Sequence, residues 1–138
     1  MPIFLCLLFV FPQGPSKEEL RQAQKLVLTN SEPSVKKGTE LCANLNCVSS
    51  MEILLRRFKG AQPHYRDIVW KGIVRFTDPY SREMIASELK KNKKSASMRQ
   101  WAAEALGIYA DATYGSVLMK AARDKDVGVR RAVAKSLG

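Results

Sequence analysis

Clusters of lysine and arginine recur at a near-constant spacing. Three of them occupy residues 56–59, 90–94 and 123–125, with the sequences RRFK, KKNKK and RDK. Such side chains bind carboxylates and phosphates, and contacts to phosphates give an affinity that depends on salt and not on base sequence. Because each cluster follows a predicted helix pair, the recurring clusters should form a positive rim along one edge of a stack of repeats.

The same clusters also have a purely structural interpretation. A cation near the C-terminus of a helix stabilises that helix by about 0.3–1 kcal/mol. The net charge of +10, from 23 Lys+Arg and 13 Asp+Glu, is equally open: it favours acidic proteins, nucleic acid or anionic lipid, or serves as a solvated surface. The predicted partner-binding set combines the rim with three arginines of preceding helices: Arg57, Lys90, Lys91, Lys94, Arg123, Arg66, Arg99 and Arg130.

Residues for catalysis are scarce. His64 is the only histidine, so metal sites and dyads that need two histidines are excluded. The sequence contains neither a glycine-rich phosphate loop nor a G-x-S-x-G elbow. We therefore predict a non-enzymatic chain with no cofactor, no metal site and no catalytic residue.

Cys42 and Cys47 lie five residues apart in CANLNC. A disulfide between them requires the backbone to leave the helix between the two residues. One isolated pair supplies too few ligands for a structural zinc site. A Cys42–Cys47 disulfide and two unlinked thiols are both compatible with this segment.

The first sixteen residues carry no charge, and Ile3 to Phe11 is an uninterrupted apolar run. This run is shorter than the roughly 20 residues of a membrane span but resembles the hydrophobic region of a secretory signal. No Lys or Arg precedes it, unlike in most export signals. The alternatives are an apolar segment packed on the first helix or a misplaced start codon. We expect a leader over 1–16, a domain over 17–138 without a membrane span, and export to the periplasm or the exterior, with a cytoplasmic location as the alternative.

An internal repeat organises the remaining chain. The segment 127–138 (VGVRRAVAKSLG) aligns without gaps on 96–107 (ASMRQWAAEALG) at an offset of 31 residues, and YRDIVWKGIV aligns upstream at an offset of 33. Apolar residues at helical spacing predict a first helix over 97–108 in the clearest copy. No segment alternates with a period of two, so the sequence predicts an all-α solenoid of about three helix pairs plus a terminal half-repeat.

Start signals place the other helices. Ser16 and Glu19 have the spacing of a capping box for a helix over 16–29. Asp78 followed by proline, Ser50 and Asp111 are predicted to cap three further helices.

The segment MRQWAAEALG…DKDVGVRRAVAKSLG resembles HEAT-like repeats of the short type first associated with phycobilisome lyases. The resemblance is strong over 95–138, moderate over 63–94 and weak over 31–62. It implies an α-solenoid that acts as a scaffold and binds another protein through its concave face and basic edge. We expect the surface of that partner to be acidic. The alternative is nucleic-acid binding, as in HEAT-like DNA glycosylases, although Trp70 and Trp101 are expected to pack between helices.

The resemblance also implies an ion pair between Asp124 or Asp126 and Arg130 or Arg131, because the family often pairs a turn acid with a first-helix arginine. The preceding turn, KKNKKSAS, supplies no acid for Arg99. Since the last unit has only its first helix, we expect the chain to be a piece of a longer protein.

Overall fold

The computed structural model describes residues 14–60 and 62–138. These residues form eight α-helices and one 3₁₀ turn, and they contain no strand. The elements are α1 Lys17–Val27, α2 Glu32–Leu45, α3 Val48–Gly60, α4 Pro63–Ile73, α5 Pro79–Lys91, α6 Ala96–Tyr109, η1 Ala112–Tyr114, α7 Gly115–Ala121 and α8 Val127–Leu137.

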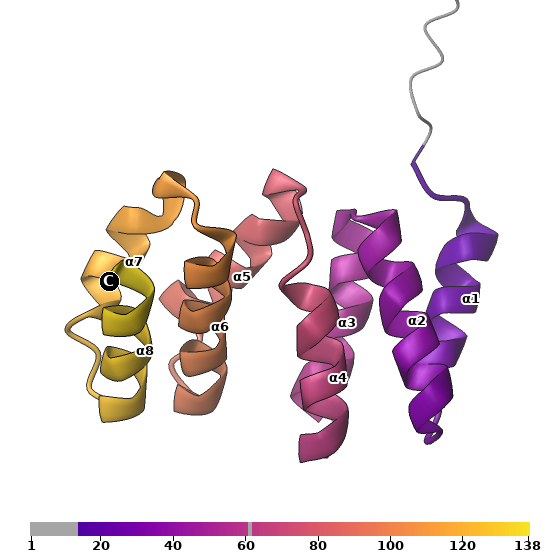
Figure 1. The fold of residues 1–138 in the computed structure, drawn as a ribbon, viewed down its shortest axis with the longest axis horizontal. Coiled ribbons are helices and arrows are strands. Elements are labelled where there is room, and N and C mark those ends of the chain that lie inside the picture. Colours follow the sequence, from indigo (N-terminus) through magenta and orange to yellow (C-terminus); the bar gives the residue numbers. More distant parts are fainter. Residues whose placement is uncertain (1–13, 61) are drawn as a thin grey trace, which may run out of the picture.

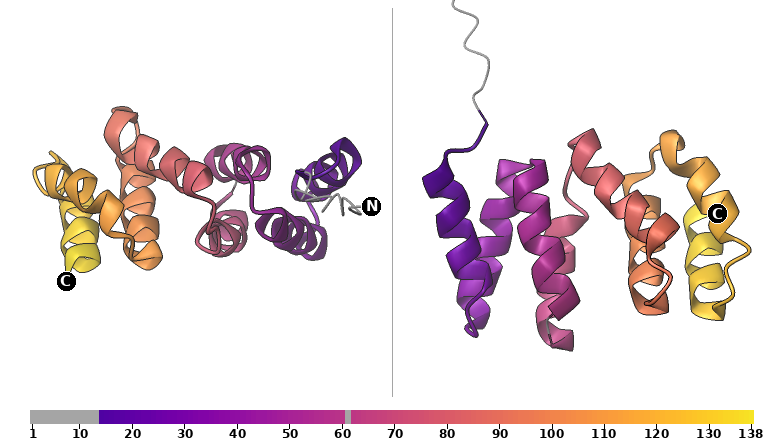
Figure 2. Two further views of the ribbon diagram at one scale, coloured as in Figure 1. Left: turned by 90° about the horizontal axis from the view of Figure 1, so that it is seen from above. Right: turned by 180° about the vertical axis from the view of Figure 1, so that it is seen from behind.

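The helices stack in two layers (Figures 1 and 2). One layer contains α2, α4, α6 and α8, and the other contains α1, α3, α5 and α7. Within each layer most neighbours in the stack pack directly, as α2 does on α4, α6 on α8 and α5 on α7. The predicted all-α solenoid is confirmed, with α1 at one end of the stack and α8 at the other.

Local signals set several helix ends as predicted. The Ser16 hydroxyl accepts from the Glu19 amide at 3.1 Å, and the Glu19 carboxylate accepts from the Ser16 amide at 2.8 Å. This capping box defines the start of α1, with Ser16 as the N-cap residue. The Asp78 carboxylate accepts from the Ser81 amide at 2.8 Å and caps α5. At the other end of α2, Asn46 adopts the left-handed conformation (φ 48°) that ends the helix.

Two predicted starts differ from the structure. Helix α3 begins at Val48, ahead of the predicted cap Ser50. Ser50 lies in the first turn of α3, and its buried hydroxyl accepts from the Cys47 amide at 3.2 Å. It therefore provides an acceptor for the backbone amide just before the helix. Asp111 does act as an N-cap, but the element it caps is η1, and α7 begins only at Gly115.

Two glycines permit close helix packing. A Cβ on Gly72 of α4 would lie 2.3 Å from Thr39 Cγ2 of α2. A Cβ on Gly107 of α6 would lie 2.9 Å from the Cα of Ser136 in α8. Both helix pairs therefore approach to distances that no larger residue allows. The Ser136 hydroxyl uses this proximity to donate to the Ala103 carbonyl at 2.8 Å.

Large aromatic side chains occupy the middle of the stack. The ring centroids of Trp70 in α4 and Trp101 in α6 are 5.2 Å apart, and those of Trp101 and Phe58 in α3 are 5.4 Å apart. The expectation that both tryptophans pack between helices agrees with these contacts. The backbones of α4 and α6, which carry these tryptophans, are less closely packed than those of α2 and α4 or α6 and α8. A buried hydrogen bond of 2.6 Å, from the Tyr109 hydroxyl in α6 to the Ile73 carbonyl in α4, also joins these helices. It thus connects the two halves of the stack, α1–α4 and α5–α8.

Among the described residues, no helix has the length and hydropathy needed to cross a bilayer. Of the predicted leader over 1–16, residues 1–13 lie outside the described part of the chain, and Ser16 caps α1.

Candidate partner-binding surface

A groove with an apolar floor and a basic rim runs between α5 and α7. Its floor contains Leu89, Val117 and Ala121, and its volume is about 540 Å³. The remaining lining residues are Lys90, Ser116, Lys120, Arg123 and Asp124. We call this depression, defined by these eight residues, the α5–α7 groove.

A second depression of about 340 Å³ adjoins the groove and shares Leu89, Lys90 and Asp124 with it. It adds Lys93 and Lys125, which belong to the turns after α5 and after α7. The turns after α5 and after α7, which carry two of the three basic clusters, therefore border one depression. Lys90 and Arg123, which are 33 residues apart in sequence, therefore line one groove.

The positive charge of the α5–α7 groove is mostly unneutralised. Lys90 pairs with Glu83 at 2.9 Å, and both side chains are about half exposed. Lys120 and Arg123 are exposed and have no ion pair with any described residue. The groove thus offers two free cations beside an apolar floor.

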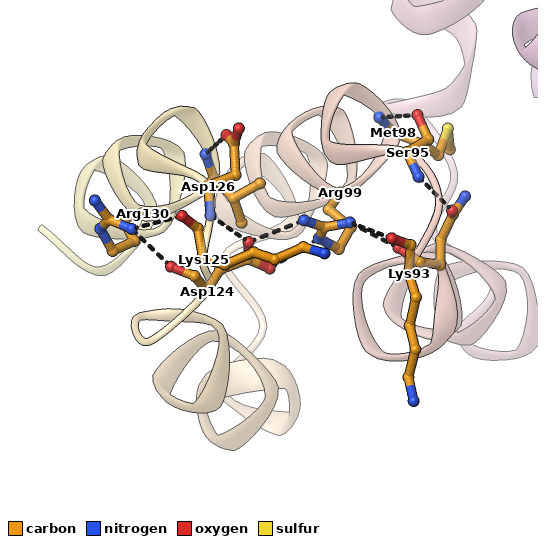
Figure 3. Close-up of polar contacts among 10 residues, drawn as sticks. Lys93, Ser95, Met98, Arg99, Asp124, Lys125, Asp126 and Arg130 are labelled. Carbon is orange, nitrogen blue, oxygen red and sulfur yellow. Dashed lines mark hydrogen bonds and ion pairs between the residues drawn. The ribbon is translucent and has the colours of Figure 1, made fainter.

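Arg99 and Asp124 form a buried bidentate pair beneath this surface (Figure 3). The Arg99 Nε and Nη2 atoms donate to the two Asp124 oxygens at 2.8 and 3.0 Å. Arg99 Nη1 also donates to the Asn92 carbonyl at 2.9 Å. Hydrogen bonds from the guanidinium hold the pKa of Asp124 below its usual range, and the same hydrogen bond raises the pKa of Arg99. Asp124 is thus ionised, but the positive charge of Arg99 beside it compensates its negative charge, so the pair adds little net charge to the groove.

This pair corrects the predicted ion pairs. The acid for Arg99 comes from the turn after α7, and Asp124 does not pair with Arg130 or Arg131. Arg130 donates instead to the Asp124 carbonyl at 2.8 Å and to the Lys125 carbonyl at 3.1 Å. Asp126 caps α8 by accepting from the Val129 amide at 3.0 Å. The side chain of Arg99 is only 6% exposed, and it lines the second depression while its donors are engaged by Asp124 and by turn carbonyls.

Arg57 lies apart from the groove and has a structural role. Its Nη2 donates to the Thr29 carbonyl at 3.2 Å, and its guanidinium lies 4.9 Å from the centre of the Tyr65 ring. Tyr65 in turn donates to the Asn30 carbonyl at 2.8 Å. Arg57 and Tyr65 thus hold the α1–α2 turn against α3 and α4, and Arg57 lines neither the α5–α7 groove nor the depression beside it.

Arg66 and Lys94 line another depression of about 400 Å³, at the N-terminal end of α6. Lys59 lines it too and forms an ion pair with Glu88. Lys91 is exposed at the end of α5 but lines none of these depressions. The predicted set is therefore dispersed. Lys90 and Arg123 line the α5–α7 groove, Arg66 and Lys94 line this depression, and Lys91 and Arg130 line neither. Arg57 and Arg99 are held by contacts within the stack.

Cys42 and Cys47, the two cysteines within the described residues, are free thiols. Helix α2 ends at Leu45, so the backbone does leave the helix between Cys42 and Cys47, but the two side chains have different surroundings. Cys42 is buried, which raises the pKa of its thiol to about 12. The Cys47 sulfur lies 3.5 Å from the Ser50 hydroxyl and is partly exposed.

Groups for metal binding are not gathered in the described residues, where no three His, Cys, Asp or Glu side chains lie together. His64 is exposed in the first turn of α4, and the centroid of its ring lies 3.9 Å from that of the Tyr65 ring, with the two planes tilted by 39°. Among the tyrosines near turns, Tyr80 is exposed, whereas Tyr109 and Tyr114 are buried. Both buried hydroxyls bond backbone carbonyls of neighbouring helices, so their roles are structural.

Stacked helix pairs with a basic groove between two of them define a helical-repeat protein of the α-solenoid class. The family model for HEAT repeats matches residues 51–138, which is more than half of the chain. The chain belongs to the HEAT-repeat family. Repeats of this family generally mediate protein–protein interaction, and proteins built from them are typically non-catalytic scaffolds. No curated protein matches the chain.

Proposed function

We propose that this protein is an interaction module that binds an acidic, partly apolar segment of a partner protein in the α5–α7 groove. The single observation that carries the proposal is the composition of that groove. An apolar floor of Leu89, Val117 and Ala121 is bordered by Lys120 and Arg123, which no described acid neutralises.

Each part of the groove favours a different feature of the ligand. Burial of apolar surface contributes about 25 cal/mol per Å², so the floor favours a segment with leucine-like side chains. The exposed cations favour glutamate and aspartate beside them, and they increase the rate of encounter more than the final affinity. The surface therefore fits an amphipathic acidic segment better than a uniformly charged polymer.

The test is a titration of the full chain with a fluorescent acidic helical peptide that carries glutamates on one face and leucines on the other. We expect the variant Lys120→Glu/Arg123→Glu to bind at least about tenfold more weakly, since two attractive contacts become repulsive. The control variant Lys25→Glu/Lys37→Glu carries the same charge change on the exposed surface of α1 and α2 and should bind almost as the parent does.

Thermal unfolding of all three proteins separates binding from folding, and we expect similar midpoints because the four residues are exposed. Equal loss of binding in both variants would mean that only overall charge matters and would contradict the groove. Duplex DNA gives the competing result: binding that falls steeply with salt and is lost only in the groove variant would assign the groove to nucleic acid.

A further inference from the structure

Arg66 in α4 is the counterpart of Arg99, but the repeat supplies no acid for it. The two arginines correspond at the offset of 33 residues between α4 and α6. Asp124, which binds Arg99, lies 25 residues after it, and the residue 25 positions after Arg66 is Lys91. The α5–α6 turn that follows, residues 92–95 (NKKS), contains no acidic residue. The stack therefore places an arginine beside this turn without the carboxylate that Arg99 has.

The guanidinium of Arg66 includes a buried donor that is not satisfied. Its Nε is inaccessible to solvent and has no hydrogen-bond partner among the described residues. The corresponding Nε of Arg99 donates to Asp124 at 2.8 Å (Figure 3). Arg66 also forms no ion pair with any described residue. Because buried donors without a partner are rare and unfavourable in folded proteins, this arginine is suited to receive an anion from outside the chain.

The depression of about 400 Å³ at the N-terminal end of α6 exposes this arginine to a ligand. We call the depression, which surrounds Arg66, Lys94 and Ser95, the Arg66 pocket. Three cations line it: Lys59 of α3, Arg66 of α4 and Lys94 of the α5–α6 turn. Lys59 pairs with Glu88, whereas Lys94 is exposed and pairs with no described acid. No acid lines the pocket, so Arg66 and Lys94 leave two positive charges uncompensated there.

The start of α6 adds hydrogen-bonding groups to these charges. The Ser95 hydroxyl accepts from the Met98 amide at 3.1 Å, which leaves its own hydrogen available to an acceptor. Ser97, one helical position further on, is exposed and also lines the pocket. Helix α6 has 14 residues, and the partial positive charge at its N-terminus favours an anion in addition to the two side-chain cations.

These groups fit a phosphate monoester better than a carboxylate. A carboxylate carries a single charge and leaves one of the two cations uncompensated. A phosphate monoester carries a charge of about −1.5 to −2 at neutral pH, and it has three strong acceptor oxygens. The planar guanidinium of Arg66 can bind two of them, and the ammonium group of Lys94 supplies a second charge. The buried side chains of Phe58 and Met98 complete the lining and offer an apolar contact to the group that carries the ester.

We propose that the Arg66 pocket binds a phosphate monoester, whose oxygens are bound by Arg66 and Lys94. A phosphorylated side chain of a partner protein and free phosphate present the same chemistry, and the test below separates these two sources. This inference does not depend on the proposed function, because the α5–α7 groove and the Arg66 pocket share no lining residue.

The test titrates the isotope-labelled full chain with inorganic phosphate and, separately, with a short peptide that contains one phosphoserine. Binding is followed by the NMR signals of the arginine Nε–H groups and of the Ser97 amide. We expect the Arg66 signal to shift and that of the exposed Arg131 to stay in place. The variant Arg66→Gln/Lys94→Gln should bind both probes about tenfold more weakly or less, as the Ser97 amide reports.

The matched control is Arg56→Gln/Lys91→Gln. It removes the same charge from exposed residues that do not line the pocket, and it should bind as the parent does. Lys94→Gln alone guards against an effect of Arg66 on folding, because Lys94 is exposed. This single variant should keep the thermal midpoint of the parent and still bind both probes at least about threefold more weakly.

The two probes identify the source of the phosphate. A phosphopeptide that binds at least about tenfold more tightly than inorganic phosphate supports the proposal with a phosphorylated partner, and similar affinities support it with free phosphate. The proposal is overturned if the Arg66 signal does not shift, or if both double variants lose binding equally. It is also overturned if the same peptide with glutamate in place of phosphoserine binds as tightly as the phosphopeptide. Tighter binding of a dinucleotide with one phosphodiester would contradict a monoester and assign the pocket to nucleic acid.

Discussion

At the scale of residues, the Arg99–Asp124 pair connects three segments. Arg99 lies in α6. Its guanidinium donates hydrogen bonds to the carbonyl groups of the α5–α6 turn and to the Asp124 carboxylate in the α7–α8 turn. Asp124 also accepts from the Asp126 amide at 2.9 Å, which fixes the turn before α8. The guanidinium of Arg99 thus holds both the α5–α6 turn and the α7–α8 turn, and the second of these turns includes Arg123.

We predict that Asp124→Asn lowers the free energy of unfolding by about 3 kcal/mol at neutral pH, because it leaves the buried Arg99 charge uncompensated. The measurement is urea denaturation of parent and variant. Arg131→Ala, which removes an exposed arginine, is the control and should change stability by no more than about 0.5 kcal/mol. An Asp124→Asn variant as stable as this control would show that the pair adds nothing.

The same pair makes stability depend on pH. The folded state holds the pKa of Asp124 below its unfolded value of about 3.9. Its contribution is therefore fully present above that value and is lost as the pH falls through the folded pKa. The stability difference between the parent and Asp124→Asn should stay constant from pH 7 to 5 and shrink below pH 4. A difference that is unchanged at the lowest pH would contradict a depressed pKa.

At the scale of elements, the sequence predicts what local interactions determine. Ser16 with Glu19, and Asp78 before Pro79, are capping signals that act within one helical turn, and both operate as predicted. The partner of Asp124 was predicted incorrectly because two arginines lie within reach, Arg99 at the preceding repeat and Arg130 on the next helix. Only the packing of α6 on α8 decides between them. The inward turn of Arg57 likewise depends on the position of the Thr29 carbonyl in another helix pair.

Glycines on the contact faces set the spacing of the helices, and Gly107 gives the most direct test. Gly107→Ala adds a methyl group where the Cα of Ser136 lies 2.9 Å away, so α6 and α8 must separate. Helix propensity alone would favour alanine by about 1 kcal/mol. We predict a net loss of about 1–3 kcal/mol, the usual cost of overpacking, measured by chemical denaturation.

Gly115→Ala is the matched control for this change. Gly115 starts α7, and a Cβ there has no neighbour within 4 Å. This variant should be as stable as the parent or more stable by up to about 1 kcal/mol. If both substitutions stabilise the protein equally, α6 and α8 can adapt to the methyl group and close approach is not required for the stack.

At the scale of the whole molecule, a stack of repeats unfolds cooperatively only if each interface between neighbours is stable. The interfaces differ here. Glycines join α2 to α4 and α6 to α8 closely, whereas aromatic rings fill the space between α4 and α6. Trp101 is central to that junction because it contacts both Trp70 and Phe58. The sequence indicated packing for the tryptophans, but not that they would join the two halves of the stack.

We therefore predict that Trp101→Ala weakens the coupling between the halves as well as the total stability. The expected loss is about 3–5 kcal/mol, as for other aromatic truncations in a core. The α5–α8 half retains the contacts among its own helices. The two halves should therefore unfold at different denaturant concentrations. Helicity by circular dichroism should then show two transitions, and fluorescence of the remaining Trp70 should follow only one of them.

Tyr80→Ala is the control for loss of an aromatic ring, since Tyr80 is 75% exposed on α5 and lies outside the junction. It should leave a single transition with an unchanged midpoint. If Trp101→Ala also unfolds in one transition that both probes follow, the halves are joined mainly by other contacts. The buried Tyr109–Ile73 hydrogen bond is one of these, because it links α6 directly to the end of α4. Adding Tyr109→Phe to Trp101→Ala would then separate the transitions, whereas Tyr109→Phe alone would preserve the single one.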